Sequence, residues 1–146
     1  MAYVVIAIPG GSTRYDDAPR VRILGASGES PSIVITYRAT AIRPDQPPIL
    51  GEITFLDVLE YRWIADVVDY EEHPQHHNDF EFGLIQITDS EYIKNMAAKG
   101  PWSHYPGQGF GPTIPESHVK HFRLAFDEYG RFDIIALGIS IREIVE

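Results

Sequence analysis

The sequence contains no cysteine, which excludes disulfides, thiolate metal sites and cysteine nucleophiles. It also lacks any apolar run near the ~20 residues that a membrane-spanning helix requires. The short apolar stretch at the start has no basic residues before it, so it predicts a first strand rather than a signal peptide, and we expect a cytoplasmic protein without membrane contact.

Basic residues are scarce, since 12 Lys and Arg stand against 21 Asp and Glu, for a formal charge of −9 at pH 7. An acidic surface repels phosphate backbones, so we expect no nucleic-acid partner. The charge can serve solubility alone. It also favours association with a partner that carries a basic surface, because acidic faces steer cationic proteins toward them.

The length of 146 residues and a hydrophobic content of 44% predict one domain, residues 1–146, with a sizeable core. Neither of the glycine-rich phosphate-binding patterns occurs. Ser12 and Ser27 follow glycine-containing turns but do not match the nucleophile elbow. With no recognised catalytic motif, we expect no cofactor and favour a non-catalytic protein over an enzyme.

The strongest local pattern is a β-hairpin near the C-terminus. Phe122, Leu124 and Phe126 alternate in the first arm, and Phe132, Ile134 and Ala136 alternate in the second. Between the arms, Gly130 can take the positive φ that a short hairpin loop needs. Period-two spacing on both sides of a glycine turn indicates antiparallel strands.

Further strands are predicted at residues 3–8, 21–24, 33–38, 49–64 and 80–87. In the longest, the alternation breaks between Leu56 and Leu59, which predicts a bulge or bend that lets one segment serve two sheets. The expected fold is mainly β: a single-domain antiparallel sandwich or flattened barrel of about seven to nine strands. An α+β fold with a helix near residues 56–65 is the alternative.

One short helix is predicted at about residues 89–98. Thr88 and Glu91 have the spacing of a capping box, and Gly100-Pro101 supplies the stop. Tyr92, Ile93, Met96 and Ala97 then form an apolar stripe, so we expect the helix to pack across an end or edge of the sheet.

Residues 100–116 form a connection with four glycines and four prolines that contains three large aromatic side chains, Trp102, Tyr105 and Phe110. Aromatic residues in such loops are often recognition residues, although they can equally cap the end of a sandwich. We expect them to contact a partner, together with the acidic residues Glu71, Glu72 and Asp79.

Three histidines, His73, His76 and His77, lie in a polar stretch that is most simply a solvated loop. They are competent metal ligands, but their spacing matches no known zinc pattern. With His104 they are the candidates for the alternative function, a small-ligand-binding or metal-dependent enzyme with its site at the end of the sandwich. His121 shares strand parity with Arg123, which predicts that both face solvent.

Carboxylates are most localised around the predicted hairpin, at Asp127, Glu128 and Asp133. A glycosidase requires two acids about 5–10 Å apart in a cleft, which spacing along the chain does not show. Turn chemistry accounts for Asp127, because its side chain can bond to the backbone of the turn.

The order of three segments resembles small uncharacterised bacterial proteins, some of them similar to immunity proteins of polymorphic toxin systems. The segments are a strand end at residues 55–63, a helix start at residues 87–93 and the hairpin at residues 120–136. The resemblance implies no catalytic residues. It implies an immunity-type inhibitor of a basic toxin or other basic partner, which agrees with a protein-binding module. Exposed sheet edges would also permit a homodimer.

Overall fold

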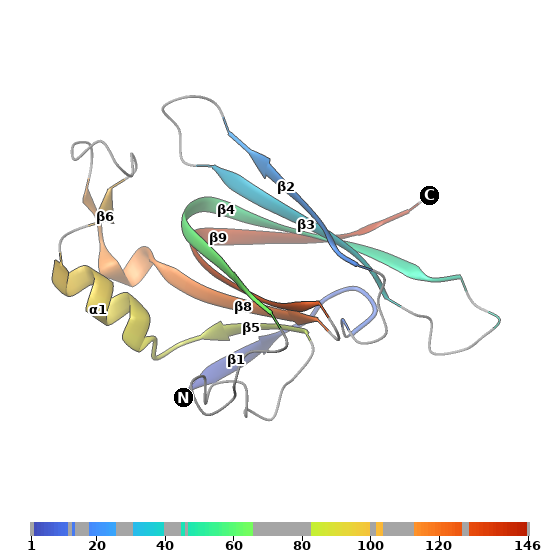
Figure 1. Cartoon of the computed structure of the whole chain (residues 1–146), viewed down its shortest axis with the longest axis horizontal. Helices are drawn as coiled ribbons and strands as arrows, with labels where there is room; N and C mark the ends of the chain where they lie inside the picture. Colours follow the sequence, from blue (N-terminus) through green and yellow to red (C-terminus); the bar gives the residue numbers. More distant parts are fainter. Residues whose placement is uncertain are drawn as a thin grey trace.

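The computed structural model describes residues 2–11, 13, 18–25, 31–39, 45, 47–65, 83–99, 102–103, 113–126 and 129–145. Seven strands form one antiparallel sheet in the order β1-β5-β8-β9-β4-β3-β2, and β6 and β7 form a separate two-stranded ribbon (Figure 1). The strands are β1 (Tyr3–Ile6), β2 (Arg20–Leu24), β3 (Ser32–Ala39), β4 (Ile49–Ile64), β5 (Gly83–Ile87), β6 (Trp102–Ser103), β7 (Thr113–Ile114), β8 (Lys120–Phe126) and β9 (Gly130–Ile144). The mainly β prediction is therefore confirmed.

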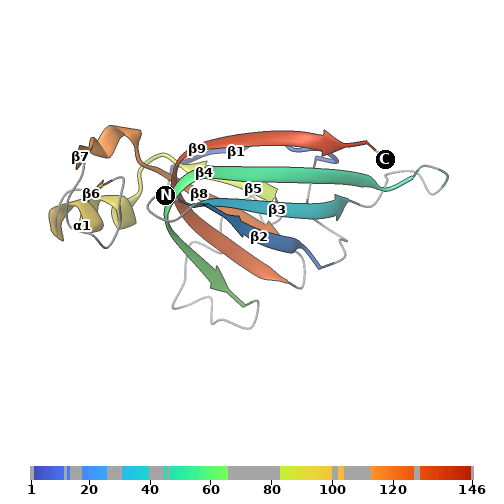
Figure 2. The same cartoon turned by 90° about the horizontal axis from the view of Figure 1, so that it is seen from above.

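The two longest strands, β4 and β9, are bent, so the sheet folds over into two layers. β4 and β9 turn together at one end of the molecule, and the remaining strands diverge from that end in two layers (Figures 1 and 2). In β4 the register shifts between Val58 and Glu60, and Asp57 has a φ of 52°. This bulge confirms the bend predicted from the broken alternation, and the helical alternative for residues 56–65 is wrong.

The sheet does not close into a barrel, because β1 and β2 stand at the two ends of its strand order. One layer contains β2, β3 and the first half of β4 with the second half of β9. The other contains β1, β5, β8 and the remaining halves of the two long strands. The predicted sandwich is thus built from a single bent sheet rather than two separate ones.

The core fills the space between the two layers, and we call the faces that line it the inner faces. Phe55 of β4 lies against Phe122 of β8 with ring centroids 5.6 Å apart, and Tyr37 of β3 lies edge-on to Phe126 at 6.4 Å. These are the alternating positions that the sequence assigned to buried faces. The core joins the layers through the side chains of Ile33, Ile35, Tyr37, Ile53, Phe55, Leu84, Phe122, Leu124, Phe126, Phe132, Ile134 and Ala136.

The hairpin of β8 and β9 is confirmed in register, with Phe126 opposite Gly130 and Phe122 opposite Ile134. Gly130 has a φ of 77°, and a Cβ there would collide with the carbonyl oxygen of Ile64. Glycine is therefore required twice at this position, by the backbone conformation and by the close approach of β4.

β1 departs from its prediction as a buried strand. Val4 and Val5 are half exposed, because among the described strands β1 stands at the end of the sheet and pairs only with β5. A short apolar run has the same sequence pattern in a central strand and in an edge strand, so the sequence could not distinguish the two positions.

The helix α1 (Glu91–Lys99) agrees with the predicted range. Its capping residue is Ser90 rather than Thr88, since the N–H of Ile93 donates to Ser90 Oγ at 3.1 Å. Ile93 packs against Val119 and against Ile135 on the outer face of β9. No helix in the described part of the chain has the length and apolar character needed to cross a bilayer.

Candidate functional site

Most of the residues predicted to carry function lie outside the described residues. For Trp102 the structure gives the backbone of β6, paired with Ile114, but not the side chain. Nowhere in the described ranges do three or more His, Asp or Glu side chains gather as a metal site would require. The predicted residues that lie outside the described part of the chain are Glu71, Glu72, Asp79, Tyr105 and Phe110 of the partner-binding set, His73, His76, His77 and His104 of the metal set, and Ser12, Ser27, Asp127 and Glu128.

The main polar constellation lies on the outer face of the sheet and is centred on Asp133 of β9. Asp133 is the direct cross-strand partner of Arg123 in β8 and of Arg62 in β4. Arg123 Nε donates to Asp133 Oδ1 at 2.8 Å, and Arg62 Nη2 lies 3.7 Å from Oδ2. Arg131 approaches from two positions along β9, with Nη2 3.5 Å from Oδ2. One carboxylate therefore faces three guanidinium groups, which we call the arginine cluster.

Burial alone would raise the pKa of Asp133. The nearby imidazole of His121 and the charges of Arg123 and Arg131 outweigh it and hold the pKa well below the ordinary value for an aspartate. Asp133 is therefore a fixed anion at neutral pH and does not serve as a proton donor.

The predicted solvent face of β8 is wrong, since His121 and Arg123 are both buried. Strand parity correctly placed the two side chains on the same face. It could not show that this face is covered, because a strand can be buried on both sides.

Ser90, His121 and Asp133 lie in line, like the members of a hydrolytic triad. Ser90 Oγ is 2.8 Å from His121 Nδ1, and His121 Nε2 is 3.5 Å from Asp133 Oδ1. The second contact is too long for a good hydrogen bond. A general base would need a carboxylate that supports its imidazolium, but this carboxylate is shared with arginines. The chain of contacts is best interpreted as a polar link that fixes the start of α1 on the sheet.

Tyr92, in the first turn of α1, joins the same face. Its hydroxyl donates to Glu60 Oε1, and the guanidinium of Arg62 lies 5.4 Å from its ring centroid. Partial burial, together with the bond to Glu60, raises the pKa of Tyr92 to about 12. The phenol therefore stays protonated at neutral pH and connects the helix to β4.

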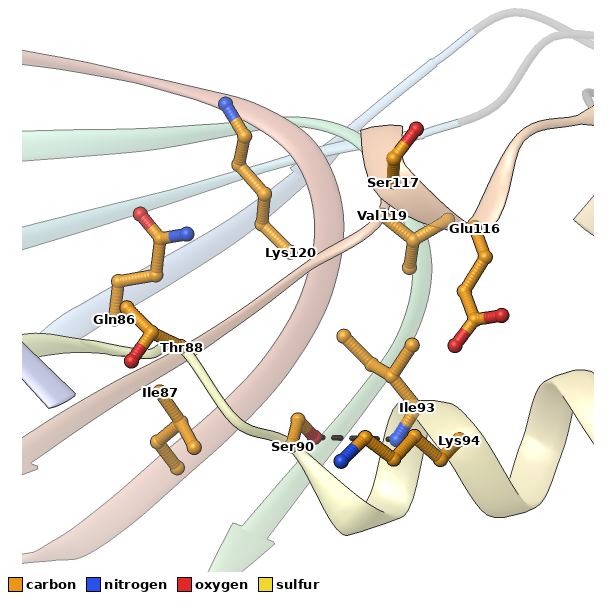
Figure 3. Close-up of a pocket in the computed structure, with 10 residues that line it drawn as sticks. All are labelled: Gln86, Ile87, Thr88, Ser90, Ile93, Lys94, Glu116, Ser117, Val119 and Lys120. Carbon is orange, nitrogen blue, oxygen red and sulfur yellow. Dashed lines mark hydrogen bonds between the residues drawn. The ribbon is translucent and has the colours of Figure 1, made fainter. Parts of the chain in front are cut away.

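An open pocket of about 590 Å³ lies where β5 leads into α1 (Figure 3). Ile87, Ile93 and Val119 are the buried apolar residues of its lining, and Lys94 and Glu116 are exposed around it. Lys94 is paired with Asp89 at 2.7 Å. Ser90 Oγ, which also lines the pocket, accepts from the N–H of Ile93 and lies 2.8 Å from His121 Nδ1, so this hydroxyl is held in place at the start of α1.

The end of β4 carries two exposed aromatic side chains that the sequence pattern did not mark as functional. Tyr61 is 47% exposed and Trp63 54% exposed, although their cross-strand partners Ile134 and Phe132 belong to the core. We call residues 60–64 the aromatic segment. The available signal was the alternation of Tyr61, Arg62 and Trp63 after the bulge, with an aromatic residue at every second position.

No protein-family model, curated protein or solved structure matches this chain. The resemblance to immunity proteins of toxin systems therefore stays a prediction. What the chain does has to be inferred from its own surface and its own buried contacts.

Proposed function

We propose that this chain is a non-catalytic protein-binding module and that the aromatic segment is the centre of its interface with a basic partner. The observation that carries the proposal is the exposure of Tyr61 and Trp63 side by side on one face of β4. Tyrosine and tryptophan are enriched among the residues that dominate binding energy at protein interfaces.

The indole of Trp63 is held in place before any partner arrives. Its Nε1 donates to the carbonyl oxygen of Tyr129 at 2.8 Å, in the turn between β8 and β9. A ring that is already oriented loses little conformational entropy on binding, which increases the affinity obtained from a given contact.

The backbone of the aromatic segment adds a second means of recognition. Pairing between β3 and β4 ends at Phe55, and beyond it the described bond on this edge of β4 is from the N–H of Val58 to the carbonyl oxygen of Pro31 at 2.8 Å. The edge of residues 60–64 opposite β9 therefore has no partner among the described strands. An extended segment of a partner could add to this edge, with the exposed rings giving specificity.

Charge favours a basic partner. The formal charge of −9 would accelerate encounter with a cationic protein. At the interface, Lys or Arg side chains of that partner could lie over the exposed faces of Tyr61 and Trp63 as cation–π contacts. An immunity-type inhibitor of a basic toxin is one specific form of this function. The loop with Trp102, Tyr105 and Phe110 and the acidic residues Glu71, Glu72 and Asp79 remain predicted parts of the same interface.

The test compares two double variants of the full chain as baits in host lysate. Tyr61→Ala with Trp63→Ala removes the proposed centre. Val21→Ala with Ile23→Ala removes two similarly exposed apolar side chains from the end strand β2 and serves as the matched control. Circular dichroism and thermal unfolding establish that both are folded.

We expect wild type and the β2 control to retain one basic protein that high salt releases, and the aromatic variant to lose it. Retention of the same protein by the aromatic variant, with the same salt dependence, would contradict the placement of the interface. Recovery of only acidic or neutral proteins would contradict the proposed partner class.

A further inference from the structure

Arg131 is buried without the hydrogen bonds that a buried guanidinium ordinarily makes. Only 3% of the residue is exposed. Among the described residues its Nε and Nη1 have no acceptor, and its remaining nitrogen reaches Asp133 Oδ2 only at 3.5 Å. Buried polar atoms are nearly always satisfied in native proteins, so two unsatisfied donors on one cation call for a specific explanation.

Asp133 can supply only part of what is missing. Its Oδ1 already accepts from Arg123 Nε at 2.8 Å. Its Oδ2 makes no hydrogen bond to any described residue and lies 3.5 Å from Arg131 Nη2 and 3.7 Å from Arg62 Nη2, so it is a single free acceptor beside two guanidinium groups. Glu60, on the same face of the sheet, accepts from the Tyr92 hydroxyl. One free oxygen of Asp133 cannot satisfy both Nε and Nη1 of Arg131, so the donors exceed the acceptor that the described contacts of the cluster offer.

The arrangement is also electrostatically costly. Burial, together with the charges of Arg123 and Arg62, lowers the pKa of Arg131 to about 10 against the attraction of Asp133. A buried cation with an incomplete set of partners destabilises a fold unless an anion completes it.

We propose that Arg131 is the centre of a binding site for a small oxyanion, such as phosphate, sulfate or a carboxylate, which accepts from Nε and Nη1. The planar guanidinium presents its donors in a fixed geometry that matches such groups. Arg62, whose side chain is half exposed, forms the solvent side of the site and offers further donors beside Asp133. This site lies on the outer face of the sheet, so it is separate from the inner-facing rings of the aromatic segment.

Thermal unfolding of the full chain tests this, with inorganic phosphate replacing chloride at constant ionic strength and pH. Sulfate and acetate are tested in the same way to distinguish phosphate-like anions from carboxylates. Arg131→Met removes the donors and keeps the length of the side chain. Arg142→Met is the matched control, since Arg142 is an exposed arginine on the same strand, paired with Glu52.

We expect the Tm of wild type and of Arg142→Met to rise by about 2–4 °C when the anion is roughly five-fold above its Kd. The Tm of Arg131→Met should not respond. An equal response of both variants, or no difference between chloride and every oxyanion, would overturn the proposal. If Arg131→Met does not fold, binding of phosphate to the wild-type protein is measured by broadening of the ³¹P line. An unbroadened line rejects the site for phosphate. For carboxylates, the response of the wild-type Tm to acetate then decides.

Discussion

Tyr37 lies across the backbone of Gly51, its direct cross-strand partner in β4, and its hydroxyl donates to the carbonyl oxygen of Pro9 at 2.7 Å. The phenol ring occupies the space that a Cβ at position 51 would fill. Glycine at 51 thus allows a buried tyrosine to reach across β4 and hold the turn that follows β1. In this pair the absence of one side chain is what permits the packing of the other.

Gly51→Ala should therefore destabilise the protein by about 1–3 kcal/mol, because the added methyl group overpacks the core against the Tyr37 ring. Urea unfolding measures the effect. Gly138→Ala is the control, since its Cβ would approach no nearer than 3.7 Å to Leu56, which is ordinary contact. Equal stabilities for the two variants would contradict the role assigned to Gly51.

Asp133→Asn should reduce the free energy of unfolding by about 3–5 kcal/mol, since it leaves buried guanidinium groups without their anion. Urea unfolding at neutral pH checks this. The control is Glu143→Gln on the same strand, an exposed position where we expect a change within about 0.5 kcal/mol. A loss at Asp133 as small as that at Glu143 would show that the cluster contributes little to stability.

The same carboxylate predicts a pH dependence. The pKa of Asp133 is lower in the folded state than in the unfolded state, so the unfolded state binds the proton more readily as the pH falls. Its stabilising contribution is complete above the unfolded pKa of about 4 and is lost as the pH falls toward the folded value. Wild type should therefore lose stability below about pH 4 more steeply than Asp133→Asn. Parallel pH profiles would argue against a lowered pKa at this position.

Ser90→Ala should destabilise α1 by about 1 kcal/mol or more, because it removes the cap of the helix and the polar partner of His121. Ser90→Thr keeps the hydroxyl and should retain most of the stability. The control is Ser117→Ala, an exposed serine that lines the same pocket, for which we expect almost no change. Urea unfolding with far-ultraviolet circular dichroism gives all three values.

The strands were predictable because alternation and turn chemistry are local properties. The hairpin around Gly130 and the bend at Leu56 to Leu59 both follow from them. The environment of His121 was not predictable, because parity decides which residues share a face but not what covers that face. The burial of Arg131 was not predictable for the same reason, since nothing beside it in the sequence marks it as buried.

Pairing between distant strands was equally hidden. Nothing near Tyr3–Ile6 indicates that its partner is Gly83–Ile87, so the edge position of β1 appears only in the assembled sheet. The exposure of Tyr61 and Trp63 also depends on assembly, because it requires that pairing with β3 stops at Phe55.

The strand order has a consequence for biosynthesis. β1 is synthesised before the other described strands of the sheet, yet β5, with which it pairs, lies about eighty residues later and is itself paired with β8. Because a ribosome adds roughly 5–20 residues per second, several seconds pass before β5 is available, and during that time the valines of β1 are exposed to other chains. The first strand of this sheet to emerge is thus among the last to be paired, and a chaperone that binds short apolar stretches could bind it in that interval.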